Sequence, residues 1–329
     1  MPSSSTATDT QNFSDMITDN KFSSSHVAMN QALPHQHRAL DRRLFLQRTA
    51  LAGFAAALSA CSQLPRRTAT PKVLHMALLS DTHIPADRTN TYRNFKPWQN
   101  LERTVPEILA AAPDGIVICG DAARLEGKTE DYKELQSLLE PLRKSMAFHI
   151  GLGNHDDRAN FLSVFNNLTT NRAPVQSRYI TVLDHPAVRL VVLDSLLYPN
   201  KTPGYLGREQ RNWLDSFLES ANDRSVALFV HHTLGDGDGD LLDTDRLISI
   251  VRRHRHVKAI FYGHSHEWKI ARGNGVALIN IPALGYNFKD SEPVGWVEAR
   301  FQSNGVDLEL HPLAGSTRWQ KQTRFVPWP

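Results

Sequence analysis

Cysteine is scarce in this chain of 329 residues, which contains only Cys61 and Cys119. At most one disulfide could form, so the sequence excludes both a disulfide framework and a cysteine-rich zinc site. The chain also lacks a large excess of charge of one sign, because it contains 37 Lys and Arg and 34 Asp and Glu. A net charge of +3 is too small to predict a surface for nucleic acid or for an anionic membrane. A ligand must therefore be recognised by a particular site, and the 15 histidines are the richest source of one.

The first 61 residues have the pattern of a disordered leader followed by an export signal. Residues 1 to 30 are rich in Ser and Thr and show no apolar period, which favours disorder. The segment Arg42-Arg43-Leu44-Phe45-Leu46 resembles the twin-arginine export motif. The uncharged stretch at 49–60 is too short to span a bilayer, which needs about 20 apolar residues. Leu58-Ser59-Ala60-Cys61 resembles the lipobox of bacterial lipoproteins, in which the cysteine is acylated.

These resemblances imply an exported protein that a lipid on Cys61 holds at a membrane, on the periplasmic side. The inner and the outer membrane both remain open. Residues 62–71 are interpreted as an exposed linker, and Cys119 would then be the only free thiol, so we expect no disulfide. The alternative interpretation of the leader is a buried amphipathic helix with an incidental cysteine.

Short apolar runs alternate with helical patterns in residues 72–313, which we expect to form one domain. The runs are rich in β-branched residues and predict strands at 73–80, 115–119, 147–151, 188–194, 226–230 and 257–262. Apolar spacing predicts helices at 100–112, 129–144 and 208–221, with Thr129 as an N-cap. Pro106 is expected to kink the first helix or to begin a new turn after a Thr104 cap. Strands alternating with helices predict an α/β fold with a largely parallel sheet.

The rhythm changes towards the end of the chain. Residues 269–272, 276–281, 295–302 and 306–311 are strand-like and separated only by turns. They predict a second, antiparallel layer. Residues 314–329 form a C-terminal tail, which could pack on the body or remain loose.

Polar side chains follow the predicted strands, at the carboxyl ends where open α/β sheets bind ligands. The successive segments are Asp81-Thr82-His83, Gly120-Asp121, Gly153-Asn154-His155-Asp156, His231-His232 and Gly263-His264-Ser265-His266. A spacing of two places both members of a pair on one side of an extended segment, so Asp81/His83 and His264/His266 can each chelate an ion.

These segments offer carboxylate, imidazole and amide ligands without thiolate. Such a set suits Mn, Fe, Zn or Co and does not suit a structural zinc site. Seven candidate ligands are too many for one ion: Asp81, His83, Asp121, Asn154, His231, His264 and His266. A shared carboxylate would let them hold two divalent metal ions, which is a hydrolytic arrangement.

The order of the segments is similar to that of the calcineurin-like metallophosphoesterase family, whose pattern is D-x-H, G-D, G-N-H-[DE], a His and G-H-x-H. The resemblance covers residues 73 to about 312 and implies a four-layer α/β sandwich of two mixed β-sheets flanked by helices. The implied ligands are Asp81, His83 and His266 for one metal, Asn154, His231 and His264 for the other, and Asp121 as the bridge.

The same resemblance implies a reaction, the metal-dependent hydrolysis of a phosphoester by a hydroxide that bridges the two ions. The family counterpart of His155 sits over the scissile phosphate, so His155 is implied as the general acid or transition-state donor. We expect Asp156 to orient the His155 imidazole.

Two neighbouring residues have alternative interpretations. His232 could exchange roles with the adjacent His231. Arg158 could clamp a phosphate oxygen, or it could be a surface residue at the start of a helix.

The substrate class is indicated by residues 153–158 and 204–214, which resemble the branch of cyclic-nucleotide and glycerophosphodiester phosphodiesterases. That branch usually carries Pro-Pro after its His pair, whereas this chain has Thr233-Leu234 and then an acidic Gly-Asp loop at 235–240. We expect this loop to be a flexible lid that repels polyanions such as nucleic acid. The small phosphoester substrate is therefore predicted to be a diester. A broad phosphomonoesterase and a non-catalytic lipoprotein that binds phosphoesters or metal are the alternatives, and the oligomeric state stays open.

Overall fold

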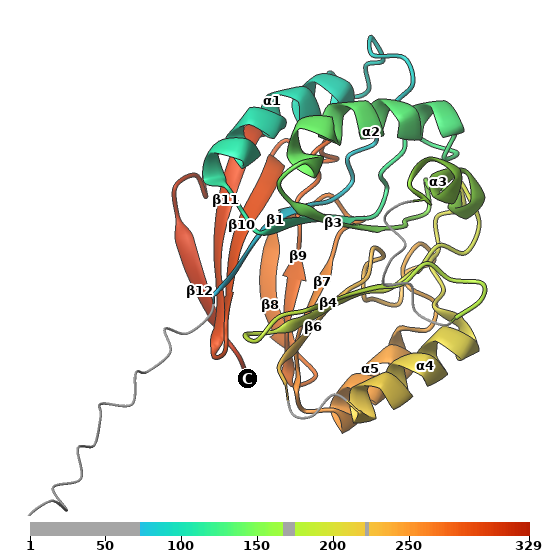
Figure 1. Cartoon of the computed structure of the whole chain (residues 1–329), viewed down its shortest axis with the longest axis vertical. Helices are drawn as coiled ribbons and strands as arrows, with labels where there is room; N and C mark the ends of the chain where they lie inside the picture. The colour runs from blue at the N-terminus through green and yellow to red at the C-terminus, as the bar shows by residue number, and fades with distance from the viewer. Residues whose placement is uncertain (1–72, 167–174, 221–223) are drawn as a thin grey trace, which may run out of the picture. The chain divides into compact units, whose positions relative to one another are not determined.

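The structure, a computed structural model, describes residues 73–166, 175–220 and 224–329, which form two six-stranded β-sheets with helices outside them (Figure 1). The strand orders are β12-β11-β10-β1-β2-β3 and β4-β5-β6-β7-β9-β8. The first sheet contains β1 (Leu74–Leu79), β2 (Gly115–Cys119), β3 (Ala147–Gly151), β10 (Pro293–Gln302), β11 (Gly305–Gly315) and β12 (Thr323–Pro327). The second contains β4 (Thr181–Asp184), β5 (Arg189–Val192), β6 (Val226–Phe229), β7 (Val257–Tyr262), β8 (Lys269–Gly273) and β9 (Val276–Asn280). The helices are α1 (Pro97–Ala111), α2 (Thr129–Arg143), α3 (Arg158–Val164), α4 (Gly207–Glu219) and α5 (Thr244–Arg253).

Apolar residues on both faces of the strands explain the layered arrangement. In β1, Ala77 and Leu79 pack with residues of α1 and α2, while Met76 and Leu78 pack in the core between the sheets. The outer face of the second sheet packs in the same way against α4 and α5. Strands buried on both faces read as continuous apolar runs, which is the pattern in the sequence. The predicted fold class, an α/β sandwich of two mixed sheets flanked by helices, is confirmed.

The predicted antiparallel layer after residue 268 is wrong, because the late strands divide between the two sheets. β9 pairs parallel with β7 and antiparallel with β8, so this hairpin completes the second sheet. β10 pairs antiparallel with the free edge of β1, opposing Leu78 to Val297, and places Val297 in the core between the sheets. β12 then pairs with β11, opposing Val306 to Val326. The first sheet thus includes residues beyond 313, where the sequence analysis ended the domain.

Two expected helix features differ in the structure. α2 begins at Thr129 itself, after Lys128 in the N-cap position without a side-chain cap. α1 starts earlier than predicted, with Pro97 in its first turn, and continues through Pro106 as one helix. The Thr104 hydroxyl donates to the Asn100 carbonyl within this helix instead of capping a new turn. Proline is well suited to a first helical turn because that position needs no N–H partner.

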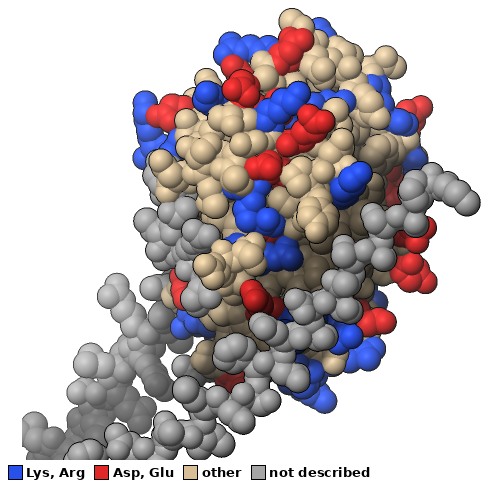
Figure 2. Space-filling view, turned by 90° about the vertical axis from the view of Figure 1, so that its right-hand side faces the viewer, with Lys and Arg blue, Asp and Glu red and all other residues tan. Residues whose placement is uncertain are grey.

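The leader at 1–61, the linker at 62–71 and the lipid site Cys61 lie outside the described residues. Within the described ranges no helix is long and apolar enough to cross a membrane. Cys119 is buried as a free thiol. Figure 2 shows Lys and Arg interspersed with Asp and Glu on the face that it presents, which agrees with the small net charge of the chain.

Candidate metal centre

The candidate ligands come from loops of both sheets. Those after β1, β2 and β3 carry Asp81 and His83, Asp121, and Asn154; those after β6 and β7 carry His231, and His264 with His266. Backbone hydrogen bonds join neighbouring loops, as from Asp81 N to the Gly120 carbonyl at 3.1 Å and from Gly263 N to the His231 carbonyl at 2.9 Å. The carboxyl ends of the strands therefore present the ligands to one region.

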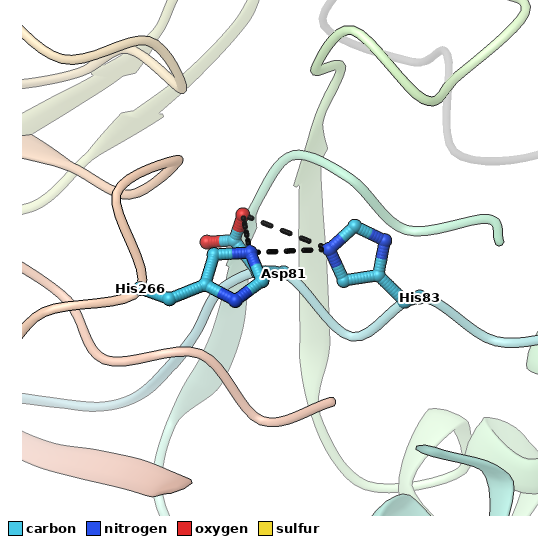
Figure 3. Close-up of side chains that lie close together, drawn as sticks. All are labelled: Asp81, His83 and His266. Carbon is cyan, nitrogen blue, oxygen red and sulfur yellow. Dashed lines mark hydrogen bonds and ion pairs between the residues drawn. The ribbon is translucent and has the colours of Figure 1, made fainter. Parts of the chain in front are cut away.

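Asp81, His83 and His266 point toward one another from two loops (Figure 3). Asp81 Oδ1 lies 3.2 Å from His266 Nε2 and 4.0 Å from His83 Nε2. The two Nε2 atoms lie 3.3 Å apart. All three side chains are buried, so the group can offer one oxygen and two nitrogens to a single ion.

Asp121, His231 and His264 form a second group of ligand atoms. Asp121 Oδ1 lies 3.3 Å from His231 Nε2, while Asp121 Oδ2 lies 3.8 Å from His83 Nε2 of the first group. The two oxygens of one carboxylate thus face imidazoles of different groups. A carboxylate in this position can be shared by two cations.

Asn154 is buried between two residues that contact Asp121. Its side-chain oxygen makes no hydrogen bond, and neither does Asp81 Oδ1 or His231 Nε2. Buried polar atoms nearly always have partners, so these three atoms without one suit a bound cation. The donor set therefore fits divalent metal ions.

Backbone carbonyls hold the second nitrogen of three imidazoles. His231 Nδ1 is 2.8 Å from the Cys119 oxygen, and His266 Nδ1 is 2.6 Å from the Tyr286 oxygen. In His264 the bonded nitrogen is Nε2, which lies 3.0 Å from the Gly239 oxygen. The nitrogen bonded to a carbonyl carries the proton, so the other nitrogen keeps a lone pair for a metal.

The electrostatics of the centre favour charged carboxylates beside two neutral imidazoles, those of His83 and His264. Burial opposes the protonation of His231, but Asp121 and Asp81 outweigh it and raise the His231 pKa to about 9. Burial opposes the ionisation of Asp121, but the surrounding imidazoles, His231 first, outweigh it and hold the Asp121 pKa well below its usual range. Burial lowers the pKa of His83 to about 3. Burial, assisted by His231, lowers the pKa of His264 to about 4. Both imidazoles are therefore neutral near pH 7 and can donate lone pairs to a cation.

Backbone strain is concentrated at the candidate ligands. Five of them have a positive φ angle: Asp81 50°, His83 47°, Asp121 49°, His264 70° and His266 54°. This left-handed region costs a residue other than glycine roughly 1 kcal/mol, and such residues gather at functional sites. The glycines beside them allow close approach, because a Cβ on Gly153 would lie 2.2 Å from Asp121 Oδ1.

His155 lies next to this centre, as predicted. Its ring is 5.3 Å from that of His83, its N–H donates to Asp121 Oδ1 at 2.8 Å, and its Nδ1 lies 2.9 Å from the Leu125 carbonyl oxygen. The side chain is only partly buried. His155 can therefore meet a ligand that enters from solvent.

The prediction that Asp156 orients His155 is wrong. Asp156 is fully buried, and its carboxylate accepts hydrogen bonds from the backbone N–H groups of Ala122, Ala123 and Gly153 and from the Tyr132 hydroxyl. The His155 imidazole has a different partner, because its Nδ1 lies against the Leu125 carbonyl oxygen. Asp156 fixes the Asp121 and Asn154 loops to each other.

Two further interpretations are decided by contacts. His231 faces the carboxylates, whereas His232 Nδ1 lies 2.7 Å from the Ser195 hydroxyl, so the two do not exchange roles. Arg158 is the first residue of α3, as one of its two interpretations expects, and its guanidinium binds the buried Asp194 carboxylate at 2.6 and 2.9 Å, which leaves it paired and only partly exposed.

The Gly-Asp loop at 235–240, expected to be a flexible lid, makes hydrogen bonds within itself and to a neighbouring segment. Gly237 N donates to the Asp240 carboxylate at 3.0 Å, and Asp240 N donates back to the Gly237 carbonyl at 2.9 Å. Gly204 N donates to the Asp240 carbonyl at 3.1 Å, which fastens the loop to a neighbouring segment. The loop thus places the Gly239 carbonyl against His264.

Sequence reasoning missed the aromatic rings that contact this centre. Tyr286 stacks on His83 with ring centroids 4.7 Å apart, and Phe288 stacks on His266 at 4.2 Å. No spacing motif marks these two residues, and they lie beyond the last His motif.

Comparison with known proteins gives a consistent result. The family model described as calcineurin-like phosphoesterase matches residues 74–268. A glycerophosphodiester phosphodiesterase of Enterobacter lignolyticus is 28% identical over 232 residues, covering 66% of this chain and 81% of the relative. A 3′,5′-cyclic adenosine monophosphate phosphodiesterase of Pseudomonas aeruginosa is 25% identical over 260 residues, covering 76% and 86%.

Two solved structures share the fold. A dimetal phosphatase from Danio rerio superposes with a TM-score of 0.62 at 16% identity, covering 79% of this chain and 100% of that chain. A purple acid phosphatase from yellow lupin gives a TM-score of 0.57 at 16% identity, covering 76% and 53%. At this identity the likeness concerns the arrangement of sheets and helices alone.

Proposed function

The chain belongs to the calcineurin-like phosphoesterase family and is a metal-dependent phosphoric ester hydrolase, and on this premise we propose that it hydrolyses phosphodiesters with two divalent ions. The observation that carries the proposal is the position of Asp121, whose two carboxylate oxygens face imidazoles of different groups at 3.3 and 3.8 Å. One carboxylate shared between two ligand groups is suited to a pair of ions.

The proposed ligands divide into two sets around Asp121. The first comprises Asp81, His83 and His266, and the second comprises Asn154, His231 and His264. Metal ions bound here would stabilise negative charge on the phosphoryl oxygens and lower the pKa of a water molecule. The carboxylate, imidazole and amide ligands suit Mn, Fe, Zn and Co.

His155 is proposed to protonate the departing alcohol. Its Nδ1 is held by the Leu125 carbonyl and its backbone N–H by Asp121, so the ring has a fixed orientation while remaining partly exposed. A partly exposed imidazole of fixed orientation can act as a general acid towards a ligand that enters from solvent.

The preference for diesters is supported by the relatives. Both named above are phosphodiesterases, and the matches extend over more than four fifths of their length. The alternative of a broad phosphomonoesterase predicts faster hydrolysis of the monoester in any matched pair.

Replacing Asp121 tests the centre. Asp121→Ala should lose both bound metals and reduce hydrolysis of every phosphoester to background, because each group loses an oxygen ligand. Metal content would be measured by elemental analysis, together with turnover on matched mono-, di- and cyclic phosphoesters. Asp245→Ala, an exposed carboxylate on α5, is the control and should keep both. Wild-type turnover in Asp121→Ala would rule out the shared carboxylate.

The location of the protein is a separate proposal that rests on residue pattern. The Arg42-Arg43 and Leu58-Ser59-Ala60-Cys61 segments support export by the twin-arginine route and attachment through a lipid on Cys61. In this proposal the hydrolase works on the periplasmic side of a membrane.

A further inference from the structure

Several exposed apolar side chains belong to segments that contact the metal centre. Among the described residues they are Tyr92, Leu125, Tyr198 and Phe288. Leu125 accepts from His155 Nδ1 through its carbonyl. Tyr198 lies two residues before Asn200, whose N–H donates to the Asn154 carbonyl at 2.6 Å. Apolar groups gathered beside a polar centre are typical of a surface that binds the organic part of a ligand.

Three aromatic rings form a continuous platform against the first ligand group. Phe288 stacks on His266 with an interplanar angle of 23°, and Tyr286 stacks on His83 with one of 27°. The Tyr92 ring meets Tyr286 edge-on at 4.6 Å. Tyr286 is buried, whereas Tyr92 and Phe288 are 38% and 45% exposed. The outer two rings therefore offer apolar area to solvent next to metal ligands.

The platform is held in place by backbone contacts. The Tyr286 carbonyl lies 2.6 Å from His266 Nδ1, and Asn287 Nδ2 donates to the Glu292 carbonyl at 2.8 Å. Rings that are already ordered lose little conformational freedom when a ligand binds, which favours affinity.

Two guanidinium groups accompany the exposed rings. Arg124 lies 4.6 Å from the centroid of Tyr92, and Arg93 lies 5.4 Å from that of Phe288. Arginine over an aromatic ring provides a planar cation that can stack on a further ring and attract a nearby anion. A flat heteroaromatic group joined to a phosphate fits both properties, whereas a glycerol phosphoester offers the anion but no ring to stack.

From these contacts we propose that the two exposed rings of the platform, Tyr92 and Phe288, act with the neighbouring Arg124 as a specificity site that binds the planar ring of the ester while its phosphate lies at the Asp and His centre. This inference rests on the proposed phosphodiesterase function and adds which chemical group the substrate carries. The ring packs against the exposed parts of Tyr92 and Phe288 and against the guanidinium plane of Arg124, which also adds its charge.

The test compares two diesters that differ in the adenine base. The methyl ester of adenosine 5′-phosphate carries this base, and the methyl ester of ribose 5-phosphate lacks it. The experiment uses the full, metal-loaded chain. Phe288→Ala and Tyr92→Ala should each lower the ratio of kcat/KM for the adenosine ester to kcat/KM for the ribose ester about tenfold, mainly through KM, as stacking losses typically do. Phe288→Trp should restore the ratio.

The matched control is Phe325→Ala, because Phe325 is 46% exposed on β12, whereas Phe288 and Tyr92 lie in loops outside the strands. It should leave the ratio unchanged. Metal content is measured in every variant, since Phe288 also touches His266. A ratio that stays constant in Phe288→Ala and Tyr92→Ala would overturn the platform while leaving the diesterase intact.

Failure of the diesterase itself gives a different result. If the metal-loaded wild type hydrolyses neither ester, the proposed function fails. The platform is then judged by calorimetric binding of adenosine 5′-phosphate and ribose 5-phosphate to the same variants. A preference for the adenosine compound that Phe288→Ala removes supports it, and equal binding overturns it.

Discussion

Asp156 illustrates how a residue inside a catalytic motif can serve the site without facing it. Its carboxylate accepts four hydrogen bonds, three of them from backbone N–H groups on the loops that carry Asp121 and Asn154. Tyr132 of α2 supplies the fourth and also accepts from Asp157 N at 2.9 Å. The carboxylate thus substitutes for backbone partners that the loops cannot give each other.

Replacing the Asp156 carboxylate should therefore weaken the connection between the loops that carry Asp121 and Asn154. Asp156→Asn puts an amide N–H₂ where one oxygen accepted two donors, and the free energy of unfolding should fall by about 2 kcal/mol. Metal affinity should fall with it. The neighbouring Asp157→Asn is the control, because Asp157 caps α3 by accepting from Asn160 N and Asn caps equally well. Urea unfolding checks the stability; equal stability of the two variants would contradict the assigned role.

The sequence allowed the ligands to be found but not the orientation of their neighbours. Asp81, His83 and Asp121 were identifiable because each follows a clear apolar run at fixed spacing. The roles of Asp156 and Arg158 depend on which way the chain turns after Asn154, and no local pattern encodes that direction. The stacking of Phe288 on His266 joins segments whose approach is set by the whole sheet.

The Gly-Asp loop after β6 stands near where the related phosphodiesterases usually carry Pro-Pro. It still positions the metal-ligand candidate His264. Gly239 gives its carbonyl to His264 Nε2 at 3.0 Å. Asp240 closes the loop through Gly237, and Leu241 N donates to the Thr233 carbonyl at 3.0 Å. These bonds make the loop a support for His264, and the expected flexibility of its glycines is removed by its own hydrogen bonds.

A change that opens the loop should weaken one ligand group selectively. Asp240→Ala removes the acceptor for Gly237 N, so metal affinity should fall about 10- to 100-fold, as it does when a partner of a ligand is lost. Isothermal calorimetry would report the change. Asp238→Ala removes an exposed carboxylate from the same loop and should leave the affinity within about twofold of wild type. Equal effects of both variants would indicate a general role of charge.

Most strand and helix positions could be predicted, because 115–119, 147–151 and 257–262 are apolar runs with definite ends. The assignment of strands to sheets could not. β10 could in principle have paired with the preceding hairpin, but the open edge of β1 and the core side chain Val297 decide its partner. Such choices depend on which edge is free once the earlier strands have packed.

At the scale of the whole chain, one prediction concerns the attachment of the protein to a membrane through a lipid on Cys61. If Cys61 is acylated after export, cells that produce the full chain should incorporate labelled palmitate into it, and Cys61→Ser should abolish the label. Cys119→Ser is the matched control and should retain the label, since Cys119 is a buried thiol of β2. Changing Arg42 and Arg43 to Lys should block export. Persistent labelling of Cys61→Ser would contradict the lipid site.

The origin of the ligands in two different sheets couples metal binding to the folding equilibrium. Asp81 and Asp121 belong to loops of the first sheet, and His231 and His266 to loops of the second. An ion held by both would bind the folded arrangement of the two sheets and not the unfolded chain, so the stability of the domain would depend on the free metal concentration. At a free metal concentration 100 times the dissociation constant, one site would add about 2.7 kcal/mol. A chelator would then lower the melting temperature of the sandwich and not only its activity, and cellular metal supply would help determine how long the enzyme survives.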